Sequence, residues 1–250
     1  MLKKNDVNIC TPIVGHTIDE VKEELRTIVP KEPDILEWRA DKFRNLADTE
    51  QVLAVLETIG DVKKEIPLLF TIRDQNEGGD PLDIDASHKI ELIERVAENS
   101  HVALIDFEVK QADGDLDRVK EAAHANNKKL ILSYHDFSAT PSNEEMIAVL
   151  RSAADKGADY AKLSVTPETK QDVLSLLSVT EEADRTLDIP VITMAMGGLG
   201  TVTRMFGWYF GSVITFAVGG QPFCPWADPY RGPGKNDHAY PKVSISEEKS

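Results

Sequence analysis

Two residues within apolar segments of this sequence could perform covalent and proton-transfer chemistry. Lys162 lies in the middle of the run 160–165, and His135 lies near the end of the run 129–137. Where no carboxylate holds a buried ammonium, its pKa falls toward neutrality, which gives an amine able to attack a carbonyl carbon. A nearby histidine can remove a proton and return it. The pair indicates a nucleophile with a proton carrier.

Both residues also have a purely structural interpretation. Lys162 could be an ammonium that Asp106 or Glu108 neutralises, since those carboxylates end another apolar run. His135 could be a hydrogen-bonded histidine of the core, which is the usual role of a single histidine in a strand. The sequence alone leaves these alternatives open.

Other strand-like runs end in charges that could hold an anionic substrate. Alternation places Glu37 and Arg39 on one face of the run 34–40, and Arg73 ends the run 68–73. A structural ion pair between Glu37 and Arg39 is the alternative, because buried charges are usually paired. However, five runs have polar residues at their carboxyl ends, and this recurrence favours a common site.

Two glycine-containing segments add further polar groups. Glu77 precedes Gly78 and Gly79 after the third run, which places a carboxylate on a loop. The segment 196–200, Met-Gly-Gly-Leu-Gly, leads into a predicted helix with Arg204 in its first turns. Helix amides and a guanidinium suit a phosphate or a carboxylate, although the same glycines also suit a plain tight turn.

The elements that must position these groups alternate along the chain. Short apolar runs recur about every 30 residues, and polar segments with helical periodicity separate them. The runs are 8–14, 34–40, 68–73, 102–109, 129–137, 160–165, 191–196 and 212–218. Eight strands with about eight helices predict an α/β fold, a parallel eight-stranded (β/α)8 TIM barrel. A doubly wound open sheet is the alternative, which the absence of a dinucleotide-binding fingerprint after the first run disfavours.

Short polar residues indicate where several helices begin. Asp19, Asp48, Asp85 and Ser142 each lie near the start of a segment with helical periodicity. Such side chains accept hydrogen bonds from the free amides of a first helical turn. We therefore expect them at helix starts.

In a barrel of this kind the polar strand ends would meet at the C-terminal mouth, where barrel enzymes have their active sites. The mouth would then contain an amine, a histidine, an orienting carboxylate and several arginines. This set indicates Schiff-base chemistry on a keto acid. No group of His, Cys and acidic residues has the spacing of a metal site, so the iminium itself would be the electron sink.

Composition excludes several other classes of protein. The chain has 250 residues, 41% hydrophobic, and a net charge of -15, which repels nucleic acid. No apolar run approaches the roughly 20 residues that span a bilayer, and the sequence begins without a signal-peptide pattern. Cys10 and Cys224 do not make a disulfide framework. We expect a cytoplasmic protein that binds neither nucleic acid nor membrane.

Five motifs occur in a specific order along the chain. They are Glu37-Trp-Arg-Ala-Asp41, Thr71-Ile-Arg73 with Glu77-Gly-Gly79, Ser133-Tyr-His-Asp-Phe137, Ala161-Lys-Leu163, and Met196-Gly-Gly-Leu-Gly200 with Arg204. From about residue 7 to residue 222 this set resembles type I 3-dehydroquinate dehydratase. The resemblance implies a (β/α)8 barrel that forms a homodimer. It also implies dehydration of 3-dehydroquinate to 3-dehydroshikimate, in the shikimate pathway of aromatic amino acid biosynthesis, without metal or cofactor.

The resemblance implies catalytic roles for three residues. Lys162 would form an iminium with the substrate ketone and so make the neighbouring C–H acidic. His135 would remove that proton and then protonate the departing hydroxyl, which gives a syn elimination. Glu77 would hold the imidazole in its orientation and charge state.

Four further residues correspond to substrate-binding positions of the family. Glu37, Arg39 and Arg73 would bind the hydroxyl-bearing side of the ring. Arg204 would bind the substrate carboxylate. The interpretation from the residues alone and the resemblance agree on all seven positions.

The C-terminal end departs from the family pattern. The family has Ser-Ala-Pro-Gly-Gln after the last strand, where this chain reads Phe223-Cys-Pro-Trp-Ala227. The codons TTC TGC CCC TGG GCA GAT CCC encode Phe-Cys-Pro-Trp-Ala-Asp-Pro, and without their first base they encode Ser-Ala-Pro-Gly-Gln-Ile. A one-base frameshift near Pro222 explains the difference. We therefore predict a catalytic barrel over 1–222 and an atypical tail over 223–250 in place of the last loop and helix.

Two other functions stay open on the sequence. The first is another Schiff-base barrel, such as an aldolase of a phosphorylated keto sugar, in which the glycine-rich loop before Arg204 would bind phosphate. The second is a catalytically impaired or binding-only barrel that results from the altered tail. The sequence also leaves open whether the enzyme serves biosynthesis or quinate breakdown.

Overall fold

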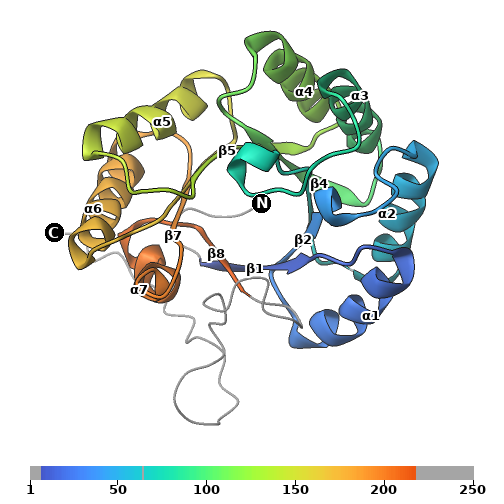
Figure 1. Ribbon diagram of the computed structural model, residues 1–250, viewed down its shortest axis with the longest axis horizontal. Coiled ribbons are helices and arrows are strands. Elements are labelled where there is room, and N and C mark those ends of the chain that lie inside the picture. The colour runs from blue at the N-terminus through green and yellow to red at the C-terminus, as the bar shows by residue number, and fades with distance from the viewer. Residues whose placement is uncertain (1–6, 64, 218–250) are drawn as a thin grey trace, which may run out of the picture.

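Eight parallel strands form the inner ring of the protein, and the chain returns outside this ring after each of the first seven strands (Figure 1). The computed structural model describes residues 7–63 and 65–217. The strands are β1 (Asn8–Ile13), β2 (Ile35–Arg39), β3 (Leu68–Thr71), β4 (Val102–Glu108), β5 (Lys129–Asp136), β6 (Tyr160–Val165), β7 (Val191–Ala195) and β8 (Ile214–Phe216). Their order is β7-β6-β5-β4-β3-β2-β1-β8, and a parallel bridge between Val191 and Ser212 joins the two ends. The predicted (β/α)8 barrel is confirmed.

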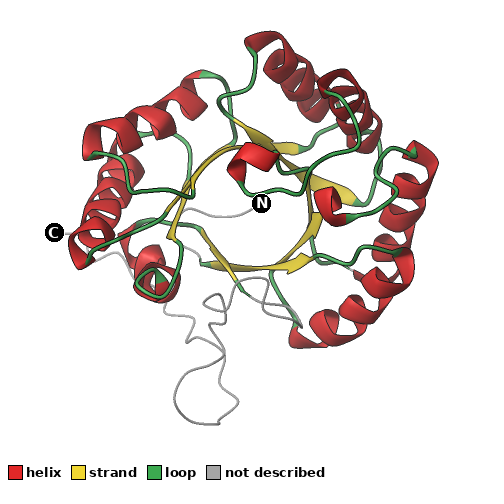
Figure 2. Cartoon of the chain, viewed as in Figure 1, coloured by secondary structure: helices red, strands yellow, loops and turns green. Residues whose placement is uncertain are grey.

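The helices surround the strands, as Figure 2 shows by colour. They are α1 (Ile18–Ile28), α2 (Thr49–Lys63), α3 (Ala86–Ala97), α4 (Asp113–Ala125), α5 (Asn143–Asp155), α6 (Lys170–Thr186) and α7 (Thr201–Phe206). Short 3-10 helices are η1 (Val29–Lys31), η2 (Ala40–Lys42), η3 (Gln75–Glu77) and η4 (Gly207–Phe210). The eighth predicted helix would follow β8, and it lies outside the described residues together with the predicted tail.

Helix starts follow the polar residues in most cases. Asp85 caps α3, and Ser142 caps α5 in a capping box with Glu145, as predicted. Asp48 accepts a hydrogen bond from the amide of Gln51 in the first turn of α2. Asp19 lies near a helix start as predicted, in the first turn of α1, but the capping residue is Thr17, whose side chain accepts from the amide of Glu20.

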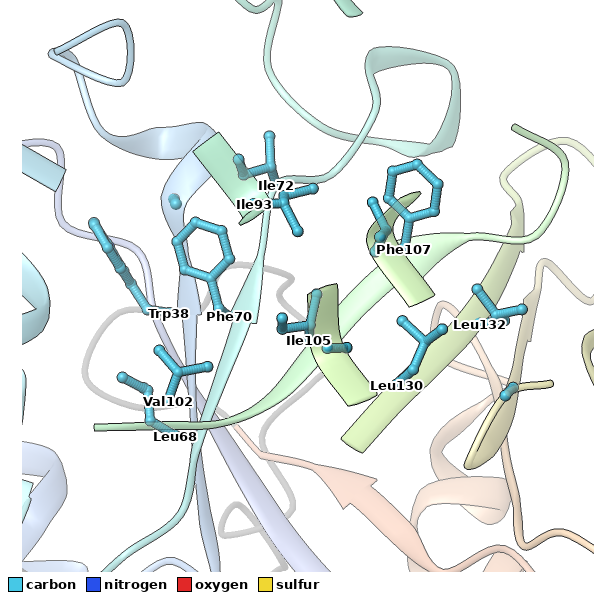
Figure 3. Packing of buried hydrophobic residues seen from close by; sticks show 14 of the residues in the cluster. Trp38, Leu68, Phe70, Ile72, Ile93, Val102, Ile105, Phe107, Leu130 and Leu132 are labelled. Atoms are coloured by element: carbon cyan, nitrogen blue, oxygen red, sulfur yellow. The ribbon is translucent and has the colours of Figure 1, made fainter. Parts of the chain in front are cut away.

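Alternation along the strands separates two apolar layers. Side chains pointing outward pack against the helices, among them Trp38, Phe70 and Ile105 in Figure 3. Side chains pointing inward form a second apolar cluster inside the ring, below the carboxyl ends of the strands. It includes Ile35, Leu69, Leu104, Ile131, Tyr160 and Ile192. Because each strand continues past this layer, its next inward residues lie at the carboxyl ends, where the polar residues were predicted.

Strand β3 ends two residues earlier than predicted. The run 68–73 was expected to be a strand throughout, but β3 covers Leu68–Thr71. The amide of Arg73 donates to the carboxylate of Asp41 at 3.3 Å rather than to a neighbouring strand. Because the Asp41 carboxylate takes this hydrogen bond, Arg73 lies outside the sheet, at the mouth of the barrel.

In the described residues, no helix has the length and hydrophobicity needed to cross a membrane.

Candidate active site

One cavity of about 470 Å³ opens at the C-terminal mouth of the barrel. All seven predicted site residues line it, namely Glu37, Arg39, Arg73, Glu77, His135, Lys162 and Arg204. Apolar side chains form much of the remaining wall: Pro12, Phe137, Met194, Met196 and Phe216. Residues from six of the strands, from segments that follow strands and from α7 therefore meet at one place.

Lys162 lies on the inward face of β6, and only 4% of its side chain is exposed. Its Nζ is 2.9 Å from Oδ2 of Asp106 on β4 and 4.5 Å from the centre of the Phe216 ring. The interpretation of Lys162 as an amine without a carboxylate partner is therefore wrong. The alternative with Asp106 describes the free enzyme, in which this ion pair holds Nζ at the wall of the cavity.

Arg73 joins this lysine to a larger buried network. Its Nη2 is 2.6 Å from Oδ1 of Asp106, and its Nη1 donates to Glu108 at 2.9 Å and to Ser133 at 2.7 Å. Ser133 donates in turn to Asp106 at 2.6 Å. Burial alone would raise the pKa of Asp106, but Arg73 and Lys162 hold that pKa well below its usual range. Asp106 thus stays ionised and is not a proton carrier.

His135 is held by Glu77 through two hydrogen bonds. Oε2 of Glu77 lies 2.9 Å from the backbone nitrogen of His135 and 3.0 Å from Nδ1 of its ring. The backbone can place Glu77 there because Gly78, directly after it, has φ +85°, a conformation that favours glycine. With Nδ1 engaged, Nε2 is the ring nitrogen left for the substrate.

The opposite wall is built from β2 and its continuation. Arg39 pairs with both carboxylate oxygens of Asp41, at 2.8 and 2.9 Å. Glu37 accepts a hydrogen bond from the Thr71 hydroxyl at 2.9 Å. Asp41 thus orients Arg39. The sequence analysis did not assign it a role, although Asp41 is the last residue of the motif Glu37-Trp-Arg-Ala-Asp41 and could have been noticed there.

Arg204 reaches the cavity from α7. Its Nη1 donates to the carbonyl of Phe216 at 3.3 Å and lies 3.8 Å from the sulfur of Met194. Gly200 precedes this helix, and a side chain there would meet the carbonyl of Ala195 at 2.0 Å. The glycine allows the loop to pass close to β7 and thereby brings Arg204 over the mouth.

A family model of type I 3-dehydroquinase matches residues 9–234 of this sequence. The 3-dehydroquinate dehydratase of Albidiferax ferrireducens is 44% identical over 217 residues, which are 87% of this chain and 82% of that protein. The chain belongs to the type I 3-dehydroquinase family. It is therefore a hydro-lyase.

Solved structures of relatives agree with this assignment. A 3-dehydroquinate dehydratase from Geobacillus kaustophilus superposes with a TM-score of 0.87 at 43% identity, covering 90% of this chain and 87% of that one. A type I enzyme from Clostridium difficile, solved with covalently modified comenic acid, gives 0.84 at 36% identity over 86% and 85% of the two chains. Neither an aldolase of keto sugars nor a binding-only barrel is favoured by these likenesses.

Charge within this type I 3-dehydroquinase shifts the proton affinity of the His135–Glu77 pair. Burial raises the pKa of Glu77 to about 7, and Glu108 and Asp106 raise it while Arg73 opposes them. Burial lowers the pKa of His135 well below its usual range, and the positive charges of Arg73 and Lys162 lower it further. The imidazole is consequently neutral at pH 7 and able to accept a proton.

The sequence analysis of this 3-dehydroquinase predicted the charged residues of the cavity but not the apolar residues of its wall. The apolar side chains Met194, Met196 and Phe216 sit on strands or strand ends that read as ordinary core. The alternation along those strands places them on the inward face and was the available signal. In the described part of the chain, no three His, Cys, Asp or Glu residues are grouped as a metal site would require.

Proposed function

We propose that this type I 3-dehydroquinase converts 3-dehydroquinate to 3-dehydroshikimate through a Schiff base on Lys162. The observation that supports the proposal is the placement of Lys162 and His135 on neighbouring strands of one cavity. Lys162 is level with Ser133 of β5, and His135 lies two residues further toward the mouth. A ring ketone bound to Nζ would place its neighbouring carbon below the imidazole.

The chemistry follows from these positions. The ammonium of Lys162, paired with Asp106 in the free enzyme, gives up one proton, and the resulting amine adds to the ketone carbon. That proton leaves with the former ketone oxygen as water, which gives the iminium. Nε2 of His135 removes a proton from the adjacent carbon, and the electron pair moves into an enamine. The enamine expels the hydroxyl group, which leaves as water with the proton from His135. Hydrolysis of the iminium by water then releases the product ketone and restores the ammonium of Lys162.

Binding is assigned to the arginines and to Glu37. We assign the substrate carboxylate to Arg204, because a guanidinium gives charge-assisted hydrogen bonds to carboxylates. Glu37, Arg39 and Arg73 face the same cavity and would contact the hydroxyl-bearing side of the ring. Arg73 also bonds to Asp106 and Glu108, so it would both bind substrate and hold the buried network together.

The proposal extends to the assembly and location of the enzyme. Its resemblance to the family supports a homodimer in the cytoplasm. Size-exclusion chromatography with light scattering would give twice the chain mass of 27.7 kDa. A monomer at micromolar concentration would contradict the dimer.

We further propose that the sequence after Pro222 results from a frameshift and replaces the final loop and helix of the barrel domain 1–222. The support is the reading Ser-Ala-Pro-Gly-Gln that a one-base change restores. Ala217, the last described residue, lines the cavity, and the departure from the family pattern begins only a few residues later in the sequence. Independent resequencing of the gene tests this, and an intact frame in every read would overturn it.

The decisive experiment for the function is trapping of the Schiff base. The protein is mixed with 3-dehydroquinate and borohydride, and intact mass and peptide mapping follow. We expect a reduced adduct on Lys162 and none with Lys162→Ala. An adduct on another lysine would overturn the mechanism. If no adduct forms, the same measurement with the Ser-Ala-Pro-Gly-Gln frame restored decides whether the tail or the mechanism is at fault.

A further inference from the structure

A lysine outside the cavity is buried against the barrel wall. Lys89 lies in the first turns of α3, where a positive charge is disfavoured by the helix dipole, and only 6% of the residue is exposed. A helical lysine normally extends into water, and burial of its ammonium requires a partner. That partner is Glu108, whose Oε2 is 2.9 Å from Nζ.

Glu108 connects this lysine to the site through its other oxygen. Oε1 accepts from Nη1 of Arg73 and from the backbone amide of Asp74, both at 2.9 Å. The carbonyl of Asp74 then accepts from the amides of Glu77 and Gly79, at 3.0 and 2.9 Å. One carboxylate therefore anchors both an arginine of the cavity and the turn on which Glu77 holds His135.

We propose that Lys89 is a positioning residue for the dehydration, because it holds Glu108 and through it fixes Arg73 and the turn that presents Glu77. Charges alternate along the chain of contacts Lys89, Glu108, Arg73, Asp106 and Lys162. Lys89 is the outer positive end of this series. The inference rests on the roles proposed above for Glu77, His135 and Lys162.

Removal of the Lys89 charge has a consequence that a merely structural lysine lacks. The charged groups that face Glu77 are Arg73, Asp106, Glu108 and the His135 ring. Without Lys89, the carboxylate of Glu108 is less neutralised, and its field favours the protonated form of Glu77. The acidic limb of kcat/KM should then move to higher pH.

The chain offers a matched control in Lys63. This lysine is also buried in a helix, at 9% exposure, and its Nζ donates to the carbonyl of Ile66 at 2.9 Å. It is the last residue of α2, just before the start of β3, at the end of the barrel away from the mouth. Lys63→Met therefore loses a buried ammonium without touching the network.

The test compares the pH profiles of kcat and KM for Lys89→Met, Lys89→Arg and Lys63→Met. We expect Lys89→Met to lose roughly ten- to hundredfold in kcat/KM and to shift its acidic limb upward. Lys89→Arg should restore the position of the limb, and Lys63→Met should keep the wild-type profile even where its Tm falls. A Lys89→Met profile that coincides with that of Lys63→Met overturns the proposal.

Two further measurements keep the test decisive. If Lys89→Met does not fold, Lys89→Gln replaces it, since the amide can still donate to Glu108 without a charge, and an unshifted limb then overturns the proposal. Trapping of wild-type enzyme with borohydride separates the two levels of inference. An adduct on Lys162 that is missing even with the Ser-Ala-Pro-Gly-Gln frame restored contradicts the proposed site, whereas a normal adduct with an unshifted Lys89→Met profile contradicts only the role of Lys89.

Discussion

In this enzyme, burial and neighbouring charges determine the protonation states of the His135 and Glu77 side chains. Lys162 is held by Asp106, and His135 is kept neutral by burial and by two nearby cations. Glu77 has the opposite tendency, because burial and two neighbouring carboxylates favour its protonated form. These residues can therefore have distinct roles within one small cavity.

Removal of the imidazole should separate capture of the substrate from its dehydration. We expect His135→Ala to form the Lys162 adduct slowly and to lose about 10²- to 10⁴-fold in kcat, because the proton carrier is absent. Borohydride trapping and steady-state turnover measure the two effects. Turnover at the wild-type rate would contradict the role of His135.

Activity should depend on the protonation of Glu77. Its pKa of about 7 means that the carboxylate is lost as the pH falls through neutrality, and kcat/KM should fall with it. Glu77→Gln should lower kcat/KM roughly tenfold or more and remove this limb, so that any remaining limb lies at lower pH, where His135 protonates. A limb near pH 7 that persists in Glu77→Gln would assign it to another group.

At the scale of elements, the loops after the strands position the side chains around His135. Glu77 lies in η3, a single 3-10 turn between β3 and α3, and the turn ends at Gly78 in the left-handed region. Phe137, in the loop directly after β5, packs against the same glycine, where a Cβ atom would lie 2.2 Å from its ring. Two loops thus meet beside the His135–Glu77 pair.

Gly78→Ala should disturb catalysis by moving this turn. The positive φ costs an alanine about 1 kcal/mol, and the methyl group must displace Phe137. We expect a lower Tm and roughly tenfold lower kcat/KM. Gly114→Ala in α4, where nothing lies within 4 Å, is the control and should keep activity with slightly higher stability. Equal kinetics for the two variants would show that the turn tolerates the change.

At the scale of the whole molecule, the barrel brings seven distant residues to one cavity. Glu37 and Arg204 are separated by most of the described sequence, yet both line the mouth. Closure is narrow between β7 and β8, which meet through one bridge at Val191. We therefore expect a change in the sequence after β8 to affect both stability and binding.

Restoring the frame after Pro222 should improve the whole enzyme. The restored serine and glutamine would each add a hydrogen bond to the substrate, of about 0.5 to 1.5 kcal/mol, so KM should fall by about tenfold. A final amphipathic helix would cover apolar surface, so the Tm should rise. Steady-state kinetics and thermal melts of the two proteins measure these effects. Identical KM and Tm would contradict the importance of the altered tail.

The sequence by itself determined the fold class, the strands and seven residues that line the cavity. Period-2 alternation is a local property, so it could be read before any contact was known, and the polar residues at strand ends marked the mouth. The last residues of strands were less certain, as Arg73 shows, because its amide donates to the side chain of Asp41 in η2 and not to a neighbouring strand.

Only the tertiary structure decided which charged side chains form ion pairs with one another. That Lys162 is held by Asp106, Arg39 by Asp41 and Lys89 by Glu108 depends on distances between residues on different elements or beyond a strand's end. Burial and proximity set the charge state of a group, and neither is a property of the sequence near that group. The choice between a paired and an unpaired lysine was therefore made by packing.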